Sequence, residues 1–139
     1  MIQSLSHTSI YVLDQEESLK FYRDKLGFEV RDDVTMDNGF RWLSVGPKTQ
    51  PDLRIVLMKI DVGPMCDAAT AETLKKLVKQ GTFGIGVFDA DDCKATYKEL
   101  VAKGVEFMGA PEEKFYGIEA IGKDPSGNWF SMTQHLKPG

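Results

Sequence analysis

The chain has 139 residues and a formal net charge of −4, with 42% hydrophobic and 27% charged residues. This length and composition are typical of one compact globular domain and exclude a disordered chain. The acidic balance offers no basic surface for nucleic acid, and no apolar run approaches the roughly 20 residues that span a bilayer, so we expect a cytoplasmic protein without nucleic-acid or membrane partners.

The first half of the chain predicts a strand, a helix and three further strands. Alternation of apolar and polar residues over 7–13 is typical of a half-buried strand. After Asp14, an acidic first turn and the spacing of Leu19, Tyr22 and Leu26 predict an amphipathic helix. Further strand candidates follow near 28–34, 40–45 and 53–60.

A connecting segment, residues 61–81, separates two similar halves. Within it, "TAETLKKLVKQG" predicts a helix that ends near Gly81. We therefore expect a first module at 1–60 and a second module at 82–139, which together make one domain.

The second half repeats the first at an offset of 75 residues, from 7 to 82. "HTSIYVLD" at 7–14 corresponds to "TFGIGVFD" at 82–89, and "ADDCKATYKELVAKG" predicts the matching helix. Such self-similarity indicates two copies of one supersecondary unit. The remaining strand candidates lie near 105–108, 117–123 and 128–134, so the fold class is α+β with two tandem βαβββ modules.

Strand alternation predicts which side chains face a pocket. In the first module these are His7, Ser9, Tyr11, Arg54, Val56 and Met58. In the second module they are Thr82, Gly84, Gly86, Trp129, Ser131 and Thr133, while Phe83, Ile85 and Val87 pack inward. The two glycines have two open interpretations: a close backbone approach or bend, or room for a ligand.

A second pairing aligns "GFRW" at 39–42 with "GIEA" at 117–120, which makes Arg41 and Glu119 counterparts. Both side chains are either exposed, as such residues usually are, or internal, where they would pair or await a polar ligand. Tyr116 precedes this second stretch and is a candidate for the cavity mouth.

The segments "HTSIYVLDQEESLKFYRDKLGFEV" and "YGIEAIGKDPSGNWFSMTQ" resemble the vicinal oxygen chelate superfamily, which includes glyoxalase I, bleomycin-resistance proteins, fosfomycin-resistance enzymes and extradiol dioxygenases. The resemblance spans almost the whole chain. It implies the glyoxalase/bleomycin resistance fold: a cupped mixed sheet with helices outside. It also implies a homodimer.

Superfamily members with metal chemistry place His and Glu ligands on the first and last strands of each module. Carried over, His7 matches such a ligand position, whereas Thr82, Ser131 and Val56 occupy the other three. Because these three side chains do not replace imidazole or carboxylate, the resemblance implies a dismantled metal site. A divalent ion held weakly by His7 and Glu119 is one open alternative. A buried, hydrogen-bonded position for His7 in the core is another.

Three functions follow as alternatives. The first is capture of a small aromatic or cationic molecule, similar to bleomycin resistance, without a cofactor, in a cavity lined by His7, Tyr11, Arg41, Arg54, Met58, Tyr116, Glu119, Trp129 and Ser131. The second is a glyoxalase-like lyase, isomerase or dioxygenase, with His7 as metal ligand or general base and Glu119 as second ligand or acid–base partner. The third is a purely structural dimeric module.

Overall fold

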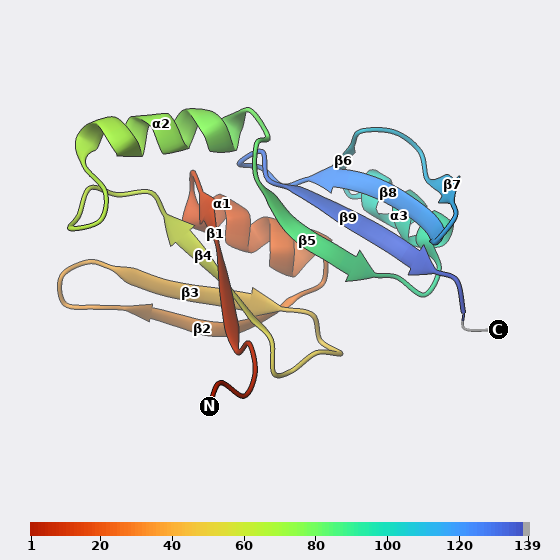
Figure 1. The fold of residues 1–139 in the computed structure, drawn as a ribbon, viewed down its shortest axis with the longest axis horizontal. Helices are drawn as coiled ribbons and strands as arrows, with labels where there is room; N and C mark the ends of the chain where they lie inside the picture. The colour runs from red at the N-terminus through yellow and green to blue at the C-terminus, as the bar shows by residue number, and fades with distance from the viewer. Residues whose placement is uncertain (138–139) are drawn as a thin grey trace.

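The computed structural model describes residues 1–137, in which the strands form two mixed sheets (Figure 1). The first sheet has the order β1-β4-β3-β2 and consists of β1 (His7–Val12), β2 (Glu29–Thr35), β3 (Arg41–Gly46) and β4 (Arg54–Lys59). The second has the order β5-β9-β8-β6, with β7 paired to β8, and consists of β5 (Gly84–Asp89), β6 (Glu106–Phe107), β7 (Glu112–Lys114), β8 (Gly117–Lys123) and β9 (Trp129–His135). The predicted α+β fold of two repeated modules is confirmed, and only the short β7 was not predicted.

The first and last strands of each module are parallel neighbours, whereas the other strand pairs are antiparallel. Strands β1 and β5 are therefore edge strands, and Figure 1 shows both beside the seam between the two sheets. This placement leaves one free backbone edge on each sheet at the middle of the molecule.

Each module carries one helix on the same side of its sheet. Helix α1 (Gln15–Lys20) continues into a short π-helix, η1 (Phe21–Lys25), and α3 is Cys93–Ala102. The side chains of Asp14 and Asp92 cap the two helix starts by accepting backbone N–H groups of Glu17 and Ala95. In Figure 1, α1 lies behind the first sheet and α3 behind the second, which leaves the opposite faces without a helix.

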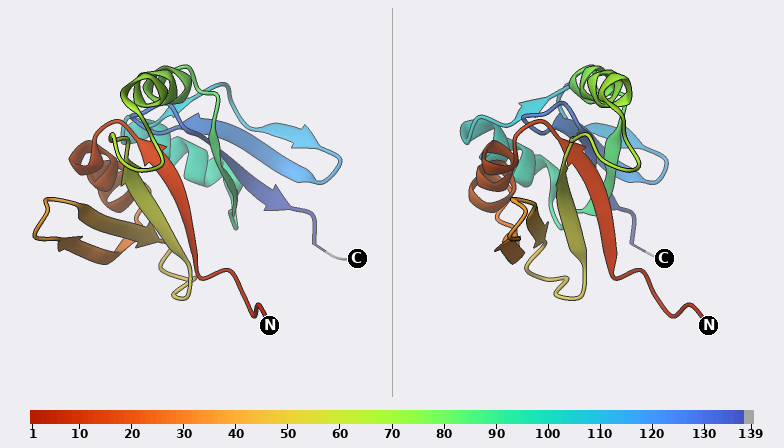
Figure 2. Two further views of the ribbon diagram at one scale, coloured as in Figure 1. Left: turned by 60° about the vertical axis from the view of Figure 1, so that its left-hand side comes forward. Right: turned by 90° about the vertical axis from the view of Figure 1, so that its left-hand side faces the viewer.

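The connecting segment forms helix α2 (Ala68–Lys79), two residues earlier than the predicted start. Figure 2 shows α2 across one end of the molecule and residues 1–6 extending away from the body. Within the described residues, no helix is both long and apolar enough to cross a membrane.

One hydrophobic core joins the two modules through their helix sides. It includes Leu19, Phe21 and Leu57 from the first module and Leu100, Phe130 and Met132 from the second. The rings of Phe21 and Phe130 lie 6.4 Å apart across the seam, and those of Phe28 and Phe88 lie 5.3 Å apart, edge to face. The core therefore fixes the two sheets relative to each other through aromatic contacts.

Candidate functional site

The helix-free face of the first sheet carries the side chains that alternation predicted for it. The register pairs His7 with Arg54 and Tyr11 with Met58, so these residues share one face. Ile10 and Val12 are buried on the opposite face, while Tyr11 is 43% exposed. A partly open surface of mixed chemistry therefore spans β1 and β4.

A polar cluster occupies one end of this face. The Arg54 guanidinium lies 3.3 Å from the Asp32 carboxylate, which also accepts a hydrogen bond from the Ser44 hydroxyl at 2.7 Å. His7 is exposed, with its Nδ1 atom 2.9 Å from the Ser6 hydroxyl and its ring 6.1 Å from that of Trp42. Arg54 already has a carboxylate partner, and His7 is a surface side chain instead of a core histidine.

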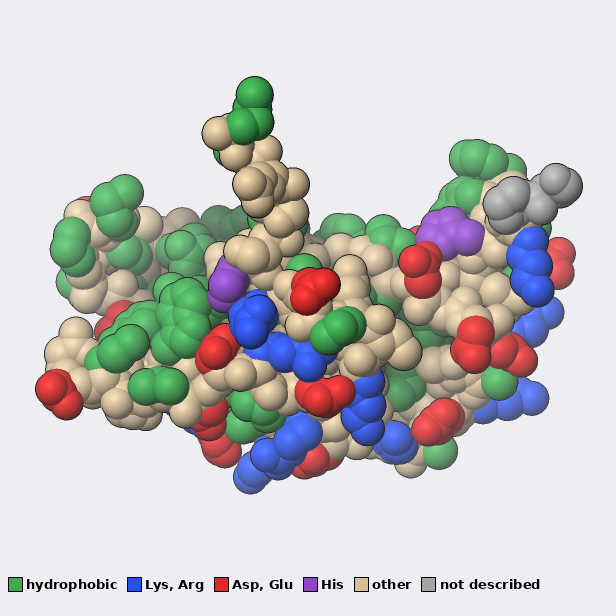
Figure 3. Space-filling model, turned by 90° about the horizontal axis from the view of Figure 1, so that it is seen from below, with side chains coloured by type: hydrophobic (Ala, Val, Ile, Leu, Met, Phe, Trp, Pro, Cys, Tyr) green, Lys and Arg blue, Asp and Glu red, His purple; other side chains and the backbone are tan. Residues whose placement is uncertain are grey.

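The other end of the face opens into a cleft of about 720 Å³. Its walls come from β1, β4, the β2–β3 hairpin tip, the chain after β4 and helix α2. The apolar residues that line it are Tyr11, Phe40, Met58, Ile60, Val62, Pro64, Met65 and Leu74. Figure 3 shows hydrophobic side chains gathered on the side of the molecule where this hairpin lies; the exposed hydrophobic residues of the hairpin are Val30, Val34, Met36 and Phe40. The volume and the apolar walls are typical of small-molecule pockets.

Arg41 lies at the rim of this cleft, but its guanidinium is held elsewhere. It donates to the Asp33 carboxylate at 2.8 and 2.9 Å and to Glu16 of α1 at 3.2 Å. These hydrogen bonds raise the pKa of Arg41 and lower that of Asp33. The pairing of Arg41 with Glu119, one of the alternatives for these two side chains, does not occur, because Arg41 points to the helix side of the first sheet.

Glu119 lies on β8 of the second sheet, where three hydroxyl groups surround its carboxylate. Ser131 and Tyr116 donate to its two oxygens, and Thr133 lies 3.4 Å from one of them. These hydrogen bonds, that from Ser131 first, lower the pKa of Glu119 below its ordinary value. Ser131 is itself only 1% exposed, so its hydroxyl serves Glu119 and is not open to a ligand.

The side chains at the end of β5 point in directions other than those predicted. A register shift between Gly84 and Gly86 turns Val87 outward, where it is 59% exposed, and Phe88 inward to the core. The expectation that Val87 packs inward is therefore wrong, because a β-bulge adds one residue and reverses the alternation after it.

The two glycines of β5 both fit the first interpretation, a close approach or a bend. A Cβ atom on Gly84 would overlap the indole ring of Trp129, whereas a Cβ on Gly86 would meet nothing within 4 Å. Gly86 has a φ of 138°, in the region that favours glycine. Gly84 thus permits a close approach of Trp129, and Gly86 permits the bulge.

The residues at the implied metal positions do not form a donor set. Within residues 1–137, no three His, Cys, Asp or Glu side chains gather closely enough to hold a metal ion. His7 and Glu119 belong to different sheets, and Ser131 and Val56 are buried without imidazole or carboxylate groups. Because zinc and related ions need at least three protein donors, these residues do not fit such a site.

Phe40 and Trp42 are site residues that the sequence interpretation did not name. Their rings lie 6.4 Å apart, and Trp42 also neighbours His7, so three rings follow one another along this face. The signal was present in the alternation of Phe40, Trp42 and Ser44 within the predicted strand at 40–45.

Comparison with known proteins gives one family and several relatives. The profile of the Glyoxalase/Bleomycin resistance protein/Dioxygenase superfamily matches residues 4–132. The uncharacterized protein YurT of Bacillus subtilis (strain 168) is 34% identical over 128 residues, which cover 91% of this chain and 95% of YurT.

Two solved structures resemble the whole chain. The crystal structure of UcmS2 is 43% identical, with 96% of this chain and 98% of that chain covered and a TM-score of 0.89. TnmS3, an antibiotic binding protein from Streptomyces sp. CB03234, is 29% identical, with 97% and 98% covered and a TM-score of 0.74. The similarity therefore extends over both modules and the segment between them.

Proposed function

The chain belongs to the Glyoxalase/Bleomycin resistance protein/Dioxygenase superfamily, and on that premise we propose that it captures a small aromatic molecule without transforming it. The observation that carries this proposal is the cleft of about 720 Å³ on the first sheet, with Tyr11, Phe40 and Met58 in its walls. Aromatic and thioether side chains favour flat apolar ligands through face and edge contacts.

The charges at this cleft support an aromatic ligand over a cationic one. Arg41 is paired with Asp33 and Glu16, and Lys59 lies 3.8 Å from Asp61. Charges with nearby partners of opposite sign leave little net field for an ionic ligand. The similarity to TnmS3, an antibiotic binding protein, supports sequestration of an aromatic antibiotic as the use of such a cleft.

The state of Glu119 supports capture over catalysis. A general base works best with a pKa near the working pH, but the hydroxyl groups around Glu119 move its pKa in the opposite direction. The proposal also assigns the protein to the cytoplasm, which cell fractionation would test.

Phe40→Ala is expected to weaken binding of 9-anthracenemethanol, a neutral aromatic probe, by about tenfold, because the probe loses one ring of the cleft wall. Isothermal titration calorimetry measures the change. Phe115→Ala is the matched control, since Phe115 is 92% exposed in the other module and does not line the cleft. Equal loss of affinity in both variants, or no binding by the unaltered protein, would show that the cleft is not the site.

Native mass spectrometry tests the alternative metal enzyme. After incubation with zinc, nickel, manganese or ferrous ions, the protein is expected to carry no stoichiometric ion, because the candidate donors His7 and Glu119 lie in separate sheets. One ion per chain that disappears in His7→Ala would support the enzyme instead. The same spectrum gives the assembly mass, for which we propose a homodimer, since β1 and β5 are edge strands.

A further inference from the structure

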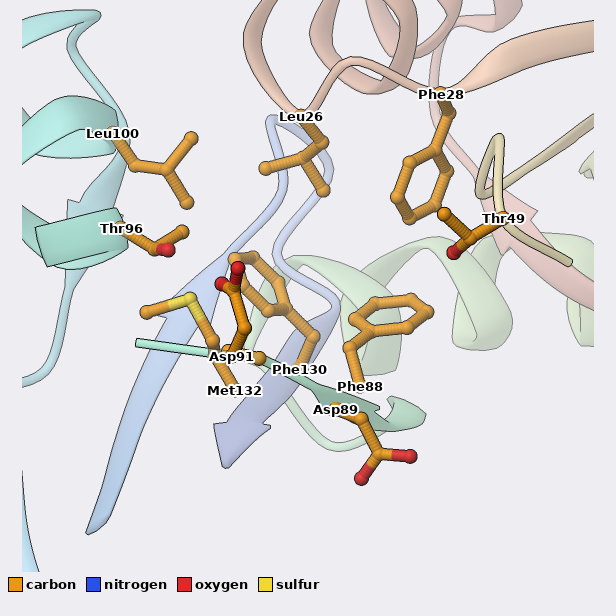
Figure 4. Close-up of a pocket in the computed structure, with 11 residues that line it drawn as sticks. Leu26, Phe28, Thr49, Phe88, Asp89, Asp91, Thr96, Leu100, Phe130 and Met132 are labelled. Atoms are coloured by element: carbon orange, nitrogen blue, oxygen red, sulfur yellow. The ribbon is translucent and has the colours of Figure 1, made fainter. Parts of the chain in front are cut away.

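A second cavity lies in the seam between the modules, on their helix sides, and we call it the seam cavity (Figure 4). It has a volume of about 640 Å³. The first module contributes the residues after η1 and the β3–β4 loop, and the second contributes α3, β9 and the end of β5. The seam cavity shares no lining residue with the cleft on the first sheet, so it is a separate site.

The walls of the seam cavity are mainly apolar. Three phenylalanines form one side, with the rings of Phe28 and Phe88 5.3 Å apart and those of Phe88 and Phe130 6.1 Å apart. Leu26, Leu100 and Met132 add aliphatic and thioether surface. Such walls remove the apolar surface of a ligand from water, which favours binding of a hydrophobic molecule.

The charged groups that line the seam cavity are all acidic. They are Asp89 and Asp91, and the other polar side chains of the lining are Thr49 and Thr96. His135 approaches Asp89, with 2.7 Å between its Nδ1 atom and a carboxylate oxygen. Figure 4 shows the Asp91 carboxylate among the lining side chains and the Asp89 carboxylate turned away from them.

Asp91 is not needed to cap α3. Asp92 does this by accepting the backbone N–H of Ala95 at 3.1 Å, while Oδ1 of Asp91 accepts only the backbone N–H of Asp92 at 2.9 Å. Within residues 1–137, the second carboxylate oxygen of Asp91 takes part in no hydrogen bond or ion pair. Asp91 is exposed to solvent at the edge of the apolar lining, where its second oxygen can accept a hydrogen bond from a cation.

We propose that the seam cavity binds a hydrophobic amine as its ammonium ion. The hydrocarbon part packs among Phe28, Phe88 and Phe130, and the ammonium group approaches Asp91. Attraction to the carboxylate favours the cation over a neutral molecule of the same shape. This site is independent of the aromatic ligand proposed for the first sheet.

Three naphthalene probes of matched shape test the charge selection: 1-naphthylmethylammonium, 1-naphthalenemethanol and 1-naphthoate. At low ionic strength the ammonium ion is expected to bind about fivefold more tightly than the alcohol, and the carboxylate more weakly than both. Asp91→Asn keeps the oxygen that accepts from Asp92, so it is expected to remove the fivefold preference and leave the affinity for the alcohol unchanged.

Two tryptophan substitutions test the location. Thr49→Trp adds bulk at a lining position and is expected to weaken the binding of both the ammonium ion and the alcohol. Lys48→Trp, at a neighbouring position outside the lining, is expected to leave both affinities unchanged. All probes are titrated in the Phe40→Ala background, which weakens the cleft of the first sheet, so that the measured binding belongs to the seam cavity. Equal affinities for ammonium and carboxylate would overturn the charge selection, and unchanged binding in Thr49→Trp would overturn the location.

Discussion

Asp124→Ala is expected to lower the free energy of unfolding by about 3–5 kcal/mol, because it leaves several buried donors without an acceptor. Asp124 is 5% exposed and lies in the turn between β8 and β9. Its Oδ1 atom accepts the backbone N–H groups of Ser126, Gly127 and Asn128 at 2.9 to 3.0 Å. The carboxylate therefore determines the shape of the turn.

The same side chain joins the two modules. Its Oδ2 atom accepts the Tyr22 hydroxyl at 2.8 Å, and Tyr22 is fully buried in the first module. Burial, and then the nearby Asp124 carboxylate, raise the pKa of Tyr22 well above its usual range, so the phenol keeps its proton and donates. Two more bonds cross the seam: Ser126 accepts from the Leu13 backbone, and Asn128 donates to the Tyr11 backbone, each at 2.8 Å.

Chemical denaturation of a small set of variants separates the turn from the bond between modules. Tyr22→Phe removes only the phenol donor and is expected to cost about 1–2 kcal/mol, less than Asp124→Ala. Asp37→Ala, in the exposed β2–β3 hairpin tip, is the matched loss of a carboxylate and is expected to change stability by less than about 0.5 kcal/mol. If Asp124→Ala proved as mild as Asp37→Ala, the network would not be an important source of stability.

The order of elements was predictable because each signal in the sequence is local. Asp14 precedes its helix with an acidic first turn, and the "DPSG" stretch, whose residues are typical of turns, forms the turn between β8 and β9. The register of β5 was not predictable by simple alternation. Its bulge depends on a positive φ at Gly86, and a glycine in a strand does not by itself tell a bulge from a close contact.

The site was predictable only where one strand determines the facing of its side chains. Tyr11 and Met58 lie where alternation placed them, whereas the partners of Arg41 come from β2 and from α1. The three hydroxyl groups around Glu119 come from β9 and from the turn before β8. These side-chain clusters bring together residues from different elements, so they depend on tertiary structure. The seam cavity depends on how the two modules pack together.

Gly84→Ala is expected to destabilise the protein by about 2 kcal/mol, although alanine in place of glycine within a strand ordinarily stabilises by roughly 0.5–1 kcal/mol. The φ of Gly84 is not positive, so alanine fits the backbone there. The added Cβ would overlap the indole ring of Trp129, the register partner of Gly84 on β9, and the ring would have to leave its place. The reversal of sign comes entirely from this one contact.

A double-mutant cycle isolates that contact. In a Trp129→Ala background the ring is gone, so Gly84→Ala is expected to stabilise by the ordinary amount of roughly 0.5–1 kcal/mol. Gly109→Ala, where a Cβ would meet nothing within 4 Å and φ is not positive, is the control. Denaturation curves give the four free energies, and tryptophan fluorescence reports whether Trp129 has moved. Equal effects of Gly84→Ala in both backgrounds would mean that the indole contact does not explain the glycine. The two original interpretations of Gly84, a bend or room for a ligand, would then both stay open.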